Sequence, residues 1–128
     1  MSESLLKPTN SEMEILQVFW KQGASTVKDI NTVLNEKKAR GYTTTLKIMQ
    51  IMADKGLLNR IPQGKLHIYN SAFTEEDIKS RMVDSLIEQV FEGAAMDMVM
   101  QALGNYSPSA SEISELKELL ARMEQVKK

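Results

Sequence analysis

Residues 41–58 of the chain read GYTTTLKIMQIMADKGLL, and residues 59–69 continue as NRIPQGKLHIY. The first stretch predicts a short helix that begins at threonines and ends at a glycine. The second predicts two short strands, joined at Pro62, Gln63 and Gly64. A helix followed at once by a hairpin is the order found in a winged helix-turn-helix, whose second helix lies in the major groove of DNA.

Helical spacing divides the expected helix into two faces. At about 100° per residue, Thr45, Met49 and Met52 share one face. We expect this face to pack against the preceding helices and the other face to remain free for a partner. The free face carries mostly polar residues, namely Thr43, Thr44, Lys47, Gln50 and Ile51.

Two further helices are expected before this one. Thr9 and Glu12 have the spacing of a capping box, and Gly23 is suited to end the helix that they begin. Ser25 or Thr26 is expected to cap the second helix. With the hairpin as a wing, residues 1–72 are predicted to form a winged-helix domain of three helices.

Residues 73–128 are predicted to form three amphipathic helices, the last of which begins at a second capping box, Ser109 and Glu112. So short a segment buries little apolar surface by itself. We therefore predict a helical dimerisation domain, in which methionines adapt to the partner surface. The alternative is that the same residues cover a core within one chain. The expected interface residues are Met82, Leu86, Val90, Met96, Val99, Met100, Leu103, Ile113, Leu116, Leu120 and Met123.

Charge is distributed unevenly along the 128 residues. The net charge is −1, but residues 1–70 carry +4 and residues 71–128 carry −5. A basic first half favours a nucleic-acid partner for that half. The chain has no cysteine and no apolar run as long as a membrane span, so a cytoplasmic protein without membrane insertion is expected.

The sequence offers little for catalysis. His67 is the only histidine, it has no acidic neighbour in the predicted hairpin, and no Gly-x-Ser-x-Gly motif is present. No metal-ligand spacing and no glycine-rich phosphate loop occurs either. We therefore expect neither an enzyme nor a cofactor.

DNA contacts can be assigned to several side chains. Thr43 and Thr44 begin the third helix, where hydroxyls meet phosphates or base edges. Lys47 can donate to guanine, and Gln50 can pair with adenine. Further contacts, chiefly to phosphates, are expected from the connector before this helix and from the wing, at Lys38, Arg40, Arg60, Lys65 and His67.

At these residues the sequence resembles the penicillinase-repressor family, the BlaI/MecI/CopY type of bacterial repressor. The matching segments are residues 9–20, 42–47, 55–58, 91–93 and 109–120. The resemblance implies a homodimeric transcriptional repressor that occupies a dyad operator in double-stranded DNA. A winged-helix adaptor that binds proteins, without specific DNA binding, is the alternative.

The resemblance also implies relief of repression by proteolysis, linked to a membrane-bound BlaR/MecR-like sensor metalloprotease. The family is cut at an Asn–Phe bond, and Asn105-Tyr106 occupies the matching place here. Two features depart from the family. Without cysteine, the chain cannot form the cysteine-rich metal site of the copper-responsive branch, and Ile51 stands where the family often has arginine.

Overall fold

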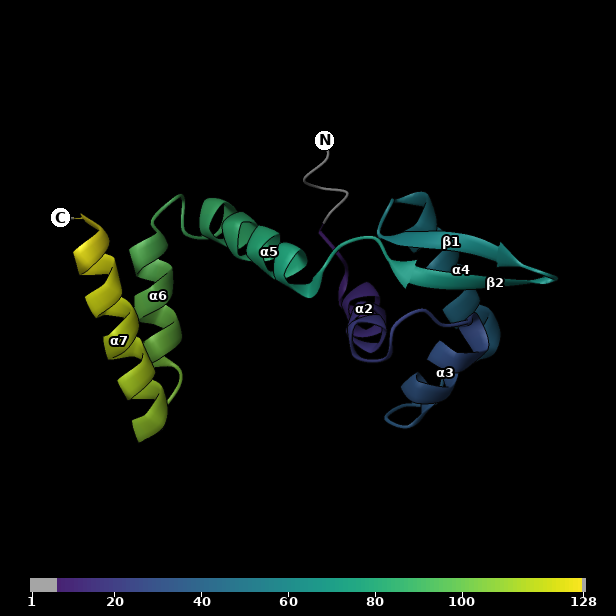
Figure 1. Cartoon of the computed structure of the whole chain (residues 1–128), viewed down its shortest axis with the longest axis horizontal. Coiled ribbons are helices and arrows are strands. Elements are labelled where there is room, and N and C mark those ends of the chain that lie inside the picture. The colour runs from purple at the N-terminus through teal and green to yellow at the C-terminus, as the bar shows by residue number, and fades with distance from the viewer. Residues whose placement is uncertain (1–6, 128) are drawn as a thin grey trace. The chain divides into compact units, whose positions relative to one another are not determined.

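The computed structural model describes residues 7–127 and divides the chain into two compact units, Met1–Ser85 and Leu86–Lys128. The described residues are mainly helical and contain one two-stranded antiparallel sheet, which confirms the predicted fold class (Figure 1). No helix within residues 7–127 is long and apolar enough to cross a membrane. In chain order the elements are α2 (Asn10–Gln22), α3 (Val27–Asn35), α4 (Tyr42–Asp54), β1 (Leu58–Gln63), β2 (Leu66–Ser71), α5 (Glu75–Gln89), α6 (Ala95–Gly104) and α7 (Ala110–Lys127).

The helix starts follow from local hydrogen bonds. At the start of α2, the Thr9 side chain accepts from the Glu12 amide and the Glu12 carboxylate accepts from the Thr9 amide, which confirms the first capping box. Thr26, rather than Ser25, caps α3, and it does so through a box with Asp29. Gly23 ends α2 with a φ of 83°, a backbone conformation that glycine adopts without strain.

The connector between α3 and α4 folds back on Asn35. The Asn35 side chain accepts a hydrogen bond from the Arg40 amide and donates one to the Arg40 carbonyl. Helix α3 therefore ends at Asn35, before the basic residues of the connector. This turn leads directly into α4.

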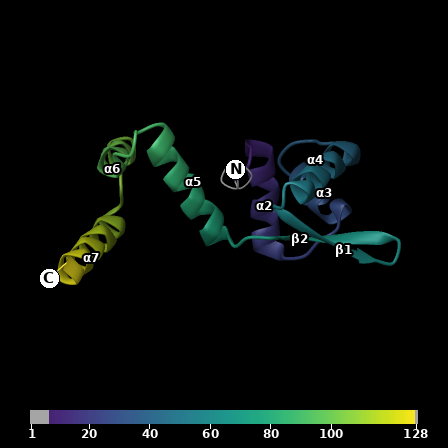
Figure 2. The same ribbon diagram turned by 90° about the horizontal axis from the view of Figure 1, so that it is seen from above.

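The winged-helix core lies between α2, α3, α4 and the hairpin, which contact one another. Ile15, Leu16 and Phe19 enter it from α2, and Ile30 enters it from α3. The hairpin extends from this cluster, with its turn pointing away from the helices (Figures 1 and 2). Tyr69 fixes the hairpin to the cluster, because it is buried and its backbone exchanges two hydrogen bonds with Ser25.

The hairpin turn is tighter than the sequence predicted. Pro62 and Gln63 belong to β1, where they pair with His67 and Leu66. The loop contains only Gly64 and Lys65, and Gly64 has a φ of 64°. A two-residue hairpin loop requires positive φ, which glycine supplies, whereas a proline is tolerated in a strand with an open edge.

Helix α5 starts as part of the winged-helix unit. Ile78 is fully buried in that core and Met82 packs against it. The Trp20 indole N–H donates to the Ser71 hydroxyl and the Phe73 carbonyl, each at 3.1 Å, and holds the chain that leads into α5. The units therefore part after Ser85 rather than after residue 72, and the first six residues of the expected domain lie outside the described residues. Met82, which is expected at a dimer interface, is half-buried and packs against the core of its own unit.

The second unit has no buried core of its own. Among residues 86–126, every side chain is exposed or half-buried. The second predicted capping box is present, because Ser109 and Glu112 exchange backbone-to-side-chain hydrogen bonds of 2.9 and 3.1 Å at the start of α7. Most large apolar side chains of α6 and α7 are nonetheless exposed.

Candidate nucleic-acid interface

The exposed face of α4 consists of the residues that the sequence placed there. Thr43, Thr44, Lys47, Gln50 and Ile51 are all exposed, and Ile51 retains 44% of its accessible surface. Thr45, Met49 and Met52, on the opposite side, are completely buried. An α-helix fits the major groove of B-DNA, which is about 12 Å wide. The structure thus leaves a helix face of suitable chemistry open to a duplex.

A hydrogen bond of the buried Thr45 side chain fixes the first half of α4. The Thr45 hydroxyl donates to the Asn31 side-chain oxygen of α3 at 2.6 Å. Sequence periodicity placed Thr45 inward but gave no partner for its hydroxyl. A buried hydroxyl without a partner is destabilising. This bond therefore favours the orientation of α4 about its own axis in which Thr45 faces Asn31.

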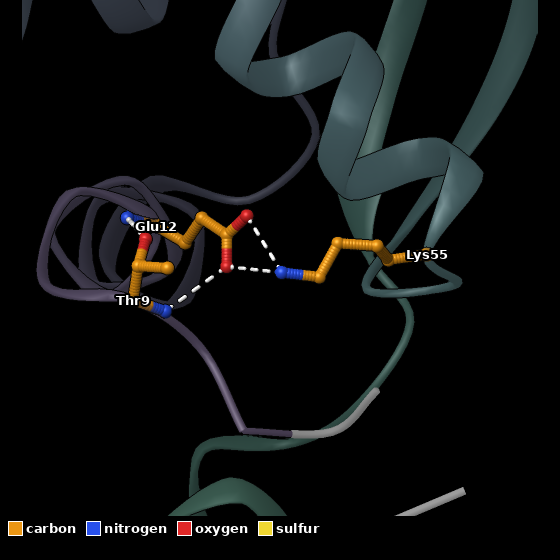
Figure 3. Close-up of polar contacts among 3 residues, drawn as sticks. All are labelled: Thr9, Glu12 and Lys55. Atoms are coloured by element: carbon orange, nitrogen blue, oxygen red, sulfur yellow. Dashed lines mark hydrogen bonds and ion pairs between the residues drawn. The ribbon is translucent and has the colours of Figure 1, made fainter. Parts of the chain in front are cut away.

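An ion pair fixes the other end of α4 to the start of α2 (Figure 3). The Lys55 ammonium donates to both Glu12 carboxylate oxygens, at 2.8 and 2.9 Å. The same carboxylate accepts from the Thr9 amide at 3.0 Å. The side chains of Lys55 and Glu12 are only 25% and 5% exposed, so this contact is far less screened by water than a surface pair. The exposed face of α4 is therefore held at both ends.

Two of the side chains expected to bind phosphate, Arg40 and Arg60, have carboxylate partners in the structure. Arg40 forms an ion pair with Glu14 of α2, and its side chain is only 17% exposed. Arg60 lies 3.8 Å from a carboxylate oxygen of Asp54. Lys38 and Lys65 are exposed, and neither takes part in an ion pair within the described part of the chain. A long-range partner such as Glu14 cannot be read from helical spacing.

The start of α4 and the wing meet at one groove. Lys65 and His67 of the hairpin line it together with Tyr42 of α4 and Lys28 of α3. The His67 ring also approaches Tyr69 edge-on, with ring centroids 6.4 Å apart. Sequence reasoning found the two hairpin residues but missed Lys28 and Tyr42, because their proximity to the wing depends on how α3 and α4 pack against the hairpin.

The segment proposed for cleavage connects α6 and α7. Asn105 caps the end of α6, and Tyr106 is exposed. The Tyr106 hydroxyl is 2.9 Å from each Glu112 carboxylate oxygen. The Ser109 amide, followed by the Tyr106 hydroxyl, stabilises the charged carboxylate and lowers the pKa of Glu112. Hydrogen bonding to this carboxylate also raises the pKa of Tyr106.

Comparisons with known proteins find relatives along nearly the whole chain. The family model described as penicillinase repressor matches residues 8–122. A penicillinase repressor from Bacillus licheniformis is 24% identical over 120 residues, covering 94% of each chain. The methicillin resistance regulatory protein MecI from Staphylococcus aureus strain N315 is 22% identical, covering 94% of this chain and 98% of MecI.

Among solved structures, the oxidised form of MarR from E. coli is similar over 95% of this chain and 85% of that one, with 16% identity and a TM-score of 0.46. That likeness is too weak to support a conclusion. The family match, in contrast, covers nearly all of the described residues. The chain therefore belongs to the penicillinase repressor family, a family of DNA-binding transcriptional repressors and not of enzymes.

Proposed function

We propose that this protein is a homodimeric repressor that occupies a dyad operator through the exposed face of α4 and the β1–β2 wing. The observation that carries the proposal is the open polar face of α4, held at one end by Thr45 and at the other by Lys55. Fixed donors and acceptors on a groove-sized helix can discriminate between bases. In this proposal the protein acts where the DNA is, in the cytoplasm.

The proposal assigns a role to the side chains of this face and to the basic residues beside it. Thr43 and Thr44 contact phosphates or base edges near the helix start. Lys47 donates to guanine and Gln50 pairs with adenine, while Ile51 contacts a thymine methyl group. Lys38 and Lys65 supply phosphate contacts that set affinity and salt dependence. Arg40 and Arg60 contribute less, because Glu14 and Asp54 already offset their charge.

The unburied second unit supports the dimer. None of residues 86–126 is buried. Packing within this segment therefore buries too little apolar surface to offset the conformational entropy that its chain loses on folding. A second copy provides the missing surface, and a two-fold dimer presents two α4 helices to two half-sites. The exposed apolar side chains available for this contact include Leu86, Val90, Met96, Val99, Met100, Leu103, Ile113, Leu116, Leu120 and Met123.

The proposal is tested by selecting bound duplexes from a random pool with the full chain. We expect enrichment of a sequence with two-fold symmetry, bound at least about 10³-fold more tightly than unrelated DNA at physiological salt. Failure to enrich any sequence, together with equal affinity for all duplexes, would instead support the protein-binding adaptor.

We further propose that repression is relieved by cleavage between Asn105 and Tyr106 by a membrane-bound sensor metalloprotease of the BlaR/MecR kind. The bond lies between α6 and α7, so its cleavage separates the helices that we assign to the dimer. In induced cells we expect a fragment whose first residue is Tyr106, identified by mass spectrometry. Recovery of only the intact chain while the operator is released would reject this step.

A further inference from the structure

The groove between α3, α4 and the wing has a volume of about 290 Å³. Its polar lining includes Lys28, Tyr42, Lys65 and His67, and its apolar lining includes Leu66. Two lysines, a tyrosine and a histidine thus line one concave surface, although they come from three elements that are separate in the sequence. We name this surface the Lys28 groove.

The residues that line the Lys28 groove carry no negative charge. None of its lining residues is aspartate or glutamate, and within residues 7–127 neither Lys28 nor Lys65 forms an ion pair. A second groove, of about 330 Å³, also contains basic residues, but Glu14 and Glu36 line it too. Of the two, the Lys28 groove is the better site for an anion.

The position of the Lys28 groove indicates which anion it takes. Tyr42 directly precedes Thr43 and Thr44, which open the exposed face of α4, and Lys65 lies in the turn of the wing. A duplex that lies against this face and the wing brings its phosphate backbone to the same edge. Lysine ammonium and phenol groups are common donors to backbone phosphates.

We propose that the Lys28 groove binds a phosphate group of the DNA backbone, with Lys28 as its principal charge contact. This assignment rests on the proposed DNA-binding function and adds to it a contact from α3, outside both α4 and the wing. The contact positions the duplex on the protein but reads no base. Lys28→Met should therefore weaken binding to operator and unrelated duplexes by the same factor.

The first experiment compares Lys28→Met with Lys21→Met in salt titrations of duplex binding. Lys21 is an exposed lysine that lines the second groove with Glu14 and Glu36, so both variants lose one surface charge. We expect the magnitude of the slope of log K against log salt concentration to fall by about 1.8 for Lys28→Met, about 0.9 for each of the two half-sites, and to be unchanged for Lys21→Met. Equal slopes and affinities for the two variants would overturn the assignment.

The second experiment identifies the phosphate. Single backbone phosphates of the operator are replaced by neutral methylphosphonates. In each half-site we expect one phosphate whose replacement weakens binding by the wild type but not by Lys28→Met. The reason is that the methylphosphonate and the Lys28→Met substitution remove the same contact. Additive losses at every position would overturn the assignment.

A control distinguishes the DNA backbone from a free anion. Inorganic phosphate should displace the operator no better than chloride at matched ionic strength. Displacement by phosphate from the wild type but not from Lys28→Met would make the groove a free-anion site and overturn the DNA assignment. If the wild type binds no duplex at all, both the proposed function and the Lys28 assignment are rejected. If the wild type and Lys28→Met bind duplexes equally well, only the Lys28 assignment is rejected.

Discussion

Leu120→Lys is expected to convert the protein to a monomer and to lower its operator affinity by about 10²–10⁴-fold, the gain that linking two binding modules typically provides. Leu120 is 60% exposed in the single chain, so the substitution removes little packing within the protomer. In the proposed dimer, two-fold symmetry places the new lysine in the interface twice. Burying an ammonium group without a partner costs several kcal/mol, enough to separate the chains.

Sedimentation equilibrium and fluorescence anisotropy with operator DNA measure the two effects. Gln125→Lys is the matched control, because it also replaces a neutral, exposed residue of α7 by lysine, away from the Leu120 face. We expect this control to remain dimeric and to bind normally. A Leu120→Lys protein that stays dimeric at micromolar concentration would reject the assigned interface.

Glu12→Ala is expected to lower the free energy of unfolding by about 2–4 kcal/mol, far more than the loss of an exposed ion pair would. The substitution removes the acceptor for the Thr9 amide and for both Lys55 contacts. The ammonium of Lys55 is left partly buried without its carboxylate. Because Lys55 is still 25% exposed, the loss should fall below that of a fully buried pair.

Urea titration followed by the fluorescence of the single tryptophan, the half-buried Trp20, measures this change. Lys55→Met should also be destabilising, because it leaves the Glu12 carboxylate, which is only 5% exposed, without its ammonium partner. Lys79→Ala is the control, since it breaks an exposed pair with Glu75 on α5 and should leave the midpoint nearly unchanged. Equal midpoints for Glu12→Ala and Lys79→Ala would show that the Glu12–Lys55 contact does not stabilise the fold.

Local spacing was sufficient to predict several elements of the fold. The 3.6-residue period assigned the buried and exposed sides of α4, and the threonine-to-glutamate and serine-to-glutamate spacings located two helix starts. These features depend on residues within one or two helical turns. The wing was also found, although its loop is only two residues long.

Contacts between distant residues were beyond prediction from one sequence. The amphipathic stripe of α5 was visible, but not that Ile78 enters the winged-helix core. The ion pair of Arg40 with Glu14 spans 26 residues, and that of Lys55 with Glu12 spans 43. For the same reason Lys28 was missed as a neighbour of the wing. The candidate DNA contacts could be predicted from side-chain chemistry. Which basic side chains have carboxylate partners in the fold could not, because that depends on packing.

The central claim is that the exposed face of α4 reads the operator sequence. Operator binding by Lys47→Ala tests this claim most directly. Affinities of the wild type and the variant are measured for duplexes that carry every single base-pair change in one half-site. We expect the wild type to lose about 1–3 kcal/mol at one guanine position that Lys47→Ala no longer distinguishes, with the discrimination at all other positions and the folded stability unchanged. A variant that keeps the complete discrimination pattern of the wild type would contradict the claim that this face of α4 reads the operator.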